Sequence, residues 1–100
     1  MFLAMNRFSI APGKEEGFEK IWRERESFLE EVPGFVSFSL LKGESDAEAS
    51  LYASHSVWES RAAFEAWTKS ENFRKAHAQA NAPQGTYLGR PNLELFDQVI

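Results

Sequence analysis

The first hydrophobic segment of the chain alternates in the manner of a β-strand. Every second position of residues 2–10 is hydrophobic with a single exception, and this row consists of Phe2, Ala4, Asn6, Phe8 and Ile10. Because successive side chains of a strand point to opposite faces, Leu3 and Met5 lie on the other face. Both faces of the strand are therefore expected to be covered, and a Pro-Gly pair at 12–13 ends it.

Residues 14–32 carry hydrophobic side chains at the spacing of a helix. The row consists of Phe18, Ile21, Trp22, Arg25, Phe28, Leu29 and Val32. Most other positions are Glu or Lys, so the pattern predicts an amphipathic helix with a solvated acidic face. Pro33-Gly34 is expected to end this helix. Arg25 is the charged member of an otherwise hydrophobic row.

Two further strands are predicted in the middle of the chain. Residues 35–41 are rich in Phe, Val and Leu, and residues 51–58 alternate. The alternating segment places Leu51, Ala53, His55 and Val57 on one face and Tyr52, Ser54, Ser56 and Trp58 on the other. The polar residues 43–48 between the two strands predict a hairpin-type loop.

Two serine residues are suitable helix caps in the second half of the chain. Ser60 precedes a predicted helix that runs through Phe64 and Trp67. Ser70 is placed to restart the helix, which then continues through His77. The sequence therefore predicts either one helix or two short helices that join near Ser70.

The order of the predicted elements indicates the fold. Residues 82–91 predict a loop, and residues 93–100 predict a closing strand. The order β-α-β-β-α-β is that of the α+β ferredoxin-like fold, in which both helices cover one face of an antiparallel sheet. A second copy of the same sheet is the simplest cover for the other face, so we expect a homodimer, a dimeric α/β-barrel. At 100 residues, the chain is expected to be a single domain, residues 1–100.

Composition excludes several classes of function. The net charge is −4 and no basic stripe is present, which argues against a nucleic-acid partner. The chain lacks cysteine and has only two histidines, His55 and His77. A metal site with several histidine ligands is therefore excluded unless carboxylates complete it. No hydrophobic run reaches the roughly 18–20 residues of a membrane span, and no secretory signal is recognisable. We therefore expect a soluble cytoplasmic protein without membrane contact.

Three residues stand out as candidates for a site. Asn6 lies inside a hydrophobic row, where a buried amide without partners costs about 1–3 kcal/mol, so either the backbone or a ligand must satisfy it. His77 shares a helix face with Phe73 and is either a neutral core residue or an iron ligand, as imidazole is in many haem proteins. Trp67 is either core or cavity wall, and only a helix break near Ser70 lets it share a cavity with His77.

The candidates fall within segments that resemble a known family. These segments are Asn6-Arg7, Pro33-Gly34-Phe35, residues 57–67 (VWESRAAFEAW) and residues 69–77 (KSENFRKAH). They resemble the antibiotic biosynthesis monooxygenase superfamily and, within it, the haem-degrading monooxygenases of the IsdG type. The likeness runs from the first residue to residue 79. Residues 80–90 match no single family pattern, and their length suggests a flap beside the haem.

The resemblance implies a haem oxygenase in which haem is both cofactor and substrate. It implies that His77 is the axial ligand of the haem iron, that Asn6 donates a hydrogen bond beside iron-bound dioxygen, and that Trp67 presses on the macrocycle. Arg25, from its place in the first helix, is a further candidate for pairing with a haem propionate. The reaction needs O2 and an external electron donor, such as a reductase, and releases iron and a linear tetrapyrrole.

Two other functions fit the same sequence. A cofactor-independent monooxygenase for a quinol or a polyketide-like phenol, as found elsewhere in the superfamily, uses Asn6 and Trp67 to position substrate and oxygen without iron. A non-catalytic dimer that stores or sequesters haem uses His77 as a ligand but performs no chemistry. Turnover of haem separates these possibilities.

Overall fold

The computed structural model describes residues 1–25, 28–79 and 82–100, and for residues 77–79 it describes the backbone alone. Within these residues the elements are, in order, β1 (Phe2–Ile10), α1 (Glu15–Glu24), the short 3-10 helix η1 (Leu29–Glu31), β2 (Phe35–Ser45), β3 (Ser50–Trp58), α2 (Arg61–Thr68), α3 (Glu71–Gln79) and β4 (Asn92–Asp97). This succession confirms the predicted order. Each described helix is too short or too polar to cross a membrane.

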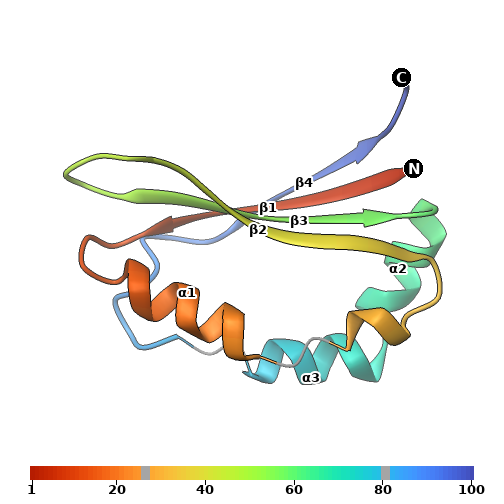
Figure 1. Ribbon diagram of the computed structural model, residues 1–100, viewed down its shortest axis with the longest axis horizontal. Coiled ribbons are helices and arrows are strands. Elements are labelled where there is room, and N and C mark those ends of the chain that lie inside the picture. The colour runs from red at the N-terminus through yellow and green to blue at the C-terminus, as the bar shows by residue number, and fades with distance from the viewer. Residues whose placement is uncertain (26–27, 80–81) are drawn as a thin grey trace.

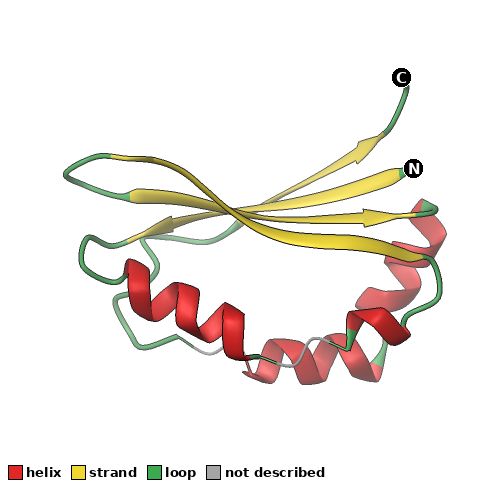
Figure 2. Cartoon of the chain, in the orientation of Figure 1, coloured by secondary structure: helices red, strands yellow, loops and turns green. Residues whose placement is uncertain are grey.

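The strands form a sheet whose helices all lie on one side. Its order is β2-β3-β1-β4, and the neighbouring strands pair antiparallel. Figures 1 and 2 show the sheet as one layer and α1, α2 and α3 as a second layer beneath it. The architecture is the predicted α+β ferredoxin-like fold.

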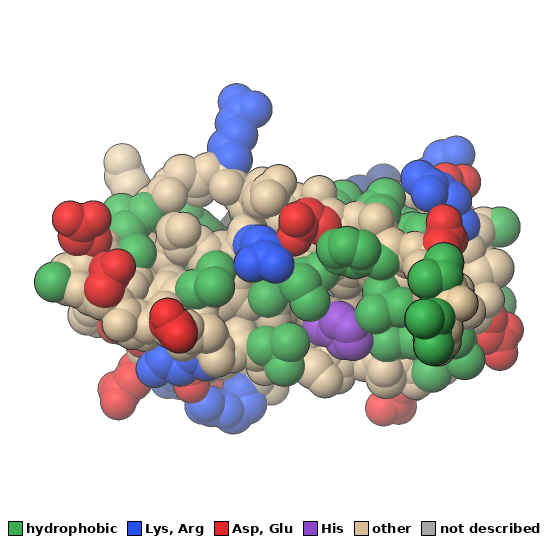
Figure 3. Space-filling model, turned by 90° about the horizontal axis from the view of Figure 1, so that it is seen from above, with side chains coloured by type: hydrophobic (Ala, Val, Ile, Leu, Met, Phe, Trp, Pro, Cys, Tyr) green, Lys and Arg blue, Asp and Glu red, His purple; other side chains and the backbone are tan. Residues whose placement is uncertain are grey.

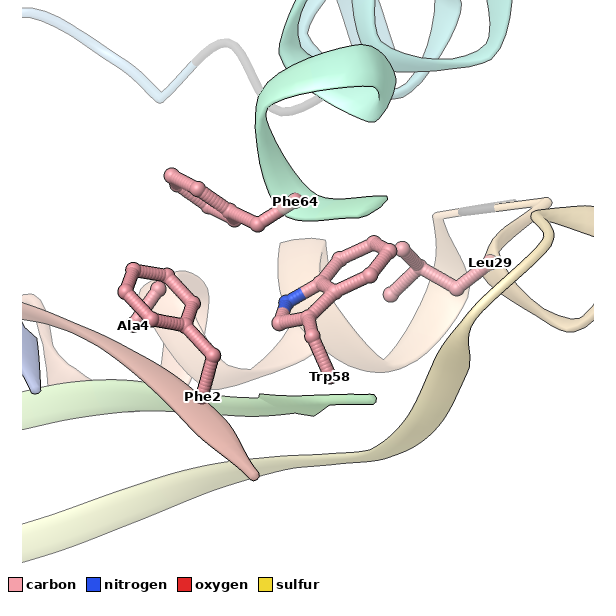
Figure 4. Packing of buried hydrophobic residues seen from close by; sticks show 5 residues of the cluster. All are labelled: Phe2, Ala4, Leu29, Trp58 and Phe64. Atoms are coloured by element: carbon pink, nitrogen blue, oxygen red, sulfur yellow. The ribbon is translucent and has the colours of Figure 1, made fainter. Parts of the chain in front are cut away.

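The core lies between these two layers. The predicted row of β1 faces the helices, because Phe2, Ala4, Phe8 and Ile10 are all buried. Trp58 is completely buried and packs with four hydrophobic neighbours shown in Figure 4, which are Phe2, Ala4, Leu29 and Phe64. A second cluster, between α1 and the sheet, consists of Phe8, Ile10, Phe18 and Tyr52.

The first helix is shorter than predicted. The prediction of a helix over residues 14–32 is wrong at Arg25, which has an extended backbone with ψ of 144°, and at Phe28 and Val32, whose backbones are not helical. Residues 26–27 of the predicted helix lie outside the described residues. Negative charge at Glu24 opposes the helix dipole at this end. The chain then turns through Phe28, whose φ is +58°, and this turn brings Leu29 into the core.

The predicted strand boundaries also change. β2 continues to Ser45 rather than ending at residue 41, so the hairpin loop is shorter than the predicted residues 43–48. Asp46 closes the turn, because its Oδ1 accepts hydrogen bonds from the N–H groups of Glu48 and Ala49. β4 ends at Asp97, so the last three residues of the predicted strand lie outside it.

Both predicted serine caps are confirmed. Ser60 Oγ accepts a hydrogen bond from the Ala63 N–H at 3.1 Å, and Ser70 Oγ accepts one from the Phe73 N–H at 3.2 Å. A turn at Lys69 therefore separates α2 from α3. The break that allows residues of the two helices to face one cavity is present.

The sheet face opposite the helices is partly hydrophobic. The register places Leu3 beside Val57 and Phe96, and Met5 beside His55, on this outer face. Figure 3 shows hydrophobic side chains spread over the face among a few charged ones. Phe96 is 47% exposed.

Candidate functional site

A cavity of about 150 Å³ lies between the sheet and the helices. The sheet contributes Ala4, Asn6, Phe38, Ser54, Ser56 and Leu93. The helices and the residue that follows α1 contribute Trp22, Arg25, Phe64, Trp67, Thr68 and Phe73. The cavity thus has mostly hydrophobic and aromatic walls with a few polar groups, the composition that is typical of small-molecule sites.

Asn6 lies on the sheet side of this cavity. In the register it is opposite Ser54 of β3 and Leu93 of β4, and all three line the cavity. The Asn6 Oδ1 atom is buried and has no hydrogen-bond partner among the described residues. Of the two alternatives posed by the sequence, satisfaction of Oδ1 by the backbone does not occur among the described residues. This oxygen is therefore available to a ligand.

Arg25 lies at the cavity as a cation stacked on aromatic rings. Its guanidinium carbon is 4.1 Å from the ring centroid of Trp22 and 5.5 Å from that of Phe38. Burial lowers the pKa of Arg25, and Tyr87 acts in the opposite direction. Within the described part of the chain, Arg25 forms no ion pair with a carboxylate. Since arginine stays protonated at neutral pH, it offers positive charge to an anionic ligand.

Trp67 is both a core residue and a wall of the cavity. Its ring centroid is 5.1 Å from that of Trp58 and 4.7 Å from that of Phe73, the latter in a T-shaped arrangement. Trp67 also lines a second hollow of about 490 Å³ between α2 and residues 31–34, which precede β2. The two interpretations of Trp67 from the sequence are therefore compatible.

The two histidines differ in what the structure describes. His77 lies in α3, one helical turn after the cavity residue Phe73, but its imidazole lies outside the described side chains. His55 points to the outer face of the sheet, beside Met5 and Ser39. The described residues contain no cluster of His, Asp and Glu that could hold a metal ion.

The cavity must widen to admit a large flat ligand. Its volume of about 150 Å³ is below the roughly 300–1,000 Å³ of most small-molecule pockets. Trp22 and Phe38 separate it from a third hollow of about 300 Å³. Their rings are stacked, with a distance of 5.8 Å between the ring centroids and an angle of 6° between the ring planes. Trp67 separates it from the hollow of about 490 Å³. These aromatic side chains are the partitions between the three hollows.

Several cavity residues were not anticipated from the sequence. Trp22, Phe38 and Ser54 belong to patterns that were recognised only as helix and strand signals. Their convergence depends on the pairing of β3 with β1 and on where α1 ends. The described part of the loop predicted as a flap lines none of this cavity, because Thr86 and Leu88 are hydrogen-bonded to the end of β1.

Known proteins match this chain over most of its length. The family model described as antibiotic biosynthesis monooxygenase matches residues 1–79. A "Heme-degrading monooxygenase" of Shouchella clausii is 33% identical over 98 residues, which are 97% of this chain and 89% of the relative. A "Heme oxygenase (staphylobilin-producing)" of Staphylococcus haemolyticus is 31% identical over 77% of this chain and 73% of the relative.

A solved structure is similar at the level of the fold and the sequence. It is that of the heme-degrader MhuD from Mycobacterium tuberculosis, with two hemes bound in its active site. The likeness covers 100% of this chain and 97% of MhuD, with a TM-score of 0.77 and 28% identity. The family match and the curated relatives thus agree with the architecture.

Proposed function

The chain belongs to the antibiotic biosynthesis monooxygenase family, and we propose that it is a haem-degrading monooxygenase of the IsdG type. It binds haem in the cavity between the sheet and the helices. With O2 and external electrons it opens the porphyrin ring and releases iron and a linear tetrapyrrole. The observation that carries this proposal is the cavity itself, where Asn6 Oδ1 without a described partner and the Arg25 cation lie among aromatic walls.

The donor set fits haem on chemical grounds. A porphyrin is flat and largely hydrophobic, which matches Trp22, Phe64 and Trp67 in the walls. Its propionates are anionic, which matches Arg25. A relative named for haem degradation matches 97% of the chain. When bound, haem supplies the iron that activates O2 and the ring carbon that is oxidised.

Each candidate residue has a distinct task in this proposal. His77 binds the iron through its neutral imidazole, as the family resemblance implies. Asn6 Nδ2 would donate a hydrogen bond to the bound ligand from the sheet side of the cavity. Trp67, whose ring packs against Trp58 and Phe73, would press on the macrocycle. Electrons come from an external donor, such as a reductase.

A haem titration tests the binding part of the proposal. Addition of haem to the purified protein is expected to give a saturable Soret band with one haem per chain. Absence of a saturable spectrum would contradict the proposal. Zinc protoporphyrin, added in parallel, reports whether the cavity accepts the ring independently of iron chemistry.

Replacement of Arg25 is expected to weaken haem binding through loss of charge. We expect Arg25→Met to raise the Kd by about tenfold, because a hydrogen bond to a charged group contributes roughly 1.5–3 kcal/mol and this site is partly exposed. Arg25→Lys keeps the charge and is expected to lose less affinity for haem. Quenching of tryptophan fluorescence by haem measures the Kd of both variants.

The dimethyl ester of haem is the matched control for Arg25. It lacks the propionate charges, so it should bind the unaltered protein and Arg25→Met equally. If the variant weakens both ligands to the same extent, Arg25 does not pair with a propionate.

We also propose that a second copy of this chain covers the outer sheet face, as the sequence predicts. On this face Phe96 lies beside Leu3 in the register, and Leu41 is 45% exposed. Arg7 and Glu94 form an ion pair between these hydrophobic groups. A face with this mixture is suited to a two-fold contact with its own copy.

Replacement of a single outer-face residue is expected to separate the protomers. Phe96→Lys introduces an unpaired charge into the contact, so we expect monomers at micromolar concentration where the unaltered protein sediments as a dimer. Sedimentation velocity measures the change. Glu16→Lys changes an exposed residue of α1 and serves as a control. An unaltered protein that sediments as a monomer would contradict this proposal.

A further inference from the structure

Two polar side chains lie side by side on the sheet side of the cavity. Asn6 of β1 is directly opposite Ser54 of β3 in the antiparallel register, and both line the cavity. Directly opposed residues have Cβ atoms about 4.5–5.5 Å apart, within reach of a serine hydroxyl and an asparagine amide. Leu93 and Leu40 flank the pair in the same row of the sheet. The pair is therefore an isolated polar patch between hydrophobic side chains.

The fold does not use the hydroxyl of Ser54. No hydrogen bond of Ser54 Oγ occurs within the described part of the chain, and Asn6 Oδ1 is buried there without a partner. Ser56, two positions along the same face, is different. Its Oγ accepts a hydrogen bond from Trp58 Nε1 at 3.0 Å and donates one to the Ala4 carbonyl oxygen at 3.4 Å. Ser56 thus stabilises the core, whereas the Ser54 hydroxyl remains available at the cavity.

We propose that Ser54 is a positioning residue for the Asn6 amide. When the ligand fills the cavity, the Ser54 hydroxyl rotates and donates a hydrogen bond to Asn6 Oδ1. Because an asparagine side chain accepts through its oxygen and donates through its nitrogen, this bond directs Nδ2 toward the ligand. The inference rests on the proposed function, since the ligand that faces Nδ2 is haem.

The orientation of the amide has a consequence for specificity. Without the bond from Ser54, Asn6 Oδ1 has no partner among the described residues, so no hydrogen bond of this oxygen favours one orientation of the amide over the other. With the bond, one donor acts at one place above the ring. A donor at a fixed place favours oxidation of one ring position over the others. Ser54 therefore acts on product distribution through Asn6.

Threonine and valine at position 54 form a matched pair for the test. The two side chains have nearly the same shape, but only threonine keeps the hydroxyl. The carbon monoxide complex of the ferrous haem-loaded protein provides the readout, because a hydrogen bond to the bound CO lowers its C–O stretching frequency. We expect Ser54→Thr to keep the frequency of the unaltered protein and Ser54→Val to shift it up to that of Asn6→Ala.

Product analysis and a double variant complete the test. Ser54→Val is expected to give a broader mixture of ring-opened isomers than Ser54→Thr. In Asn6→Ala the frequency should not respond to the residue at position 54, because Ser54 acts only through the amide. Equal frequencies for the Thr and Val variants would overturn this inference and leave the proposed function intact. An unaltered protein that binds no haem would overturn both.

Discussion

The His77→Ala variant is expected to bind haem at least about 100-fold more weakly than the unaltered protein and to lose its Soret spectrum. The lower limit of this expected loss comes from metal sites in general, where removal of a group that only supports a ligand already lowers the affinity about 10–100-fold. Removal of the proposed iron ligand itself is expected to cost more. The expectation rests on the sequence and on the position of residue 77 in α3, one turn after the cavity residue Phe73.

His55→Ala is the control for this prediction, since no other histidine is present. His55 points to the outer face of the sheet, away from the cavity, so its removal should leave the haem spectrum and affinity unchanged. Titrations of both variants under the same conditions measure the difference. Equal losses in the two variants, or tight and specific binding by His77→Ala, would contradict the assignment.

Replacement of Trp58 by alanine is expected to lower the free energy of unfolding by about 3–5 kcal/mol. Trp58 is completely buried. Its ring centroid lies 5.6 Å from that of Phe35, 5.9 Å from that of Phe64 and 5.1 Å from that of Trp67. The change leaves a cavity at the centre of the core and removes the donor to Ser56. For a domain whose total stability is roughly 5–15 kcal/mol, this is a large fraction.

Urea unfolding of the ligand-free protein, followed by far-ultraviolet circular dichroism at fixed protein concentration, measures this loss. Trp58→Phe keeps an aromatic ring but not the indole N–H, so it is expected to lose about 1–2 kcal/mol. If Trp58→Ala costs no more than Trp58→Phe, the ring contacts of the core contribute less than this account requires.

The sequence was sufficient to predict which side chains of a strand share a face. The alternation in residues 2–10 places Asn6 among buried neighbours, and the structure has it there, on the helix-facing side of β1. The caps at Ser60 and Ser70 were also predictable, because each serine accepts a hydrogen bond from a residue only three positions later. These features are local, so they depend on little besides the neighbouring residues.

The parts of the site that depend on distant residues were not predictable. The pairing of Asn6 with Ser54 is set by the register between β1 and β3, and alternation alone does not fix a register. The sequence pattern includes Arg25 in a longer helix, but α1 ends before it and its guanidinium stacks on Trp22 instead. The helical pattern continued past this point because Leu29 is buried as well, although it reaches the core through a turn.

Aerobic turnover of haem with identification of the product tests the central claim most directly. The haem-loaded protein is mixed with a reductant in air, with catalase present to remove free peroxide, and His77→Ala serves as the inactive control. We predict loss of the Soret band, release of iron to a chelator and a linear tetrapyrrole in the extract. A Soret band that persists with reductant and O2 would contradict the claim and indicate a haem-binding module. Oxidation of a quinol by the haem-free protein, with no haem turnover, would instead indicate a cofactor-independent monooxygenase.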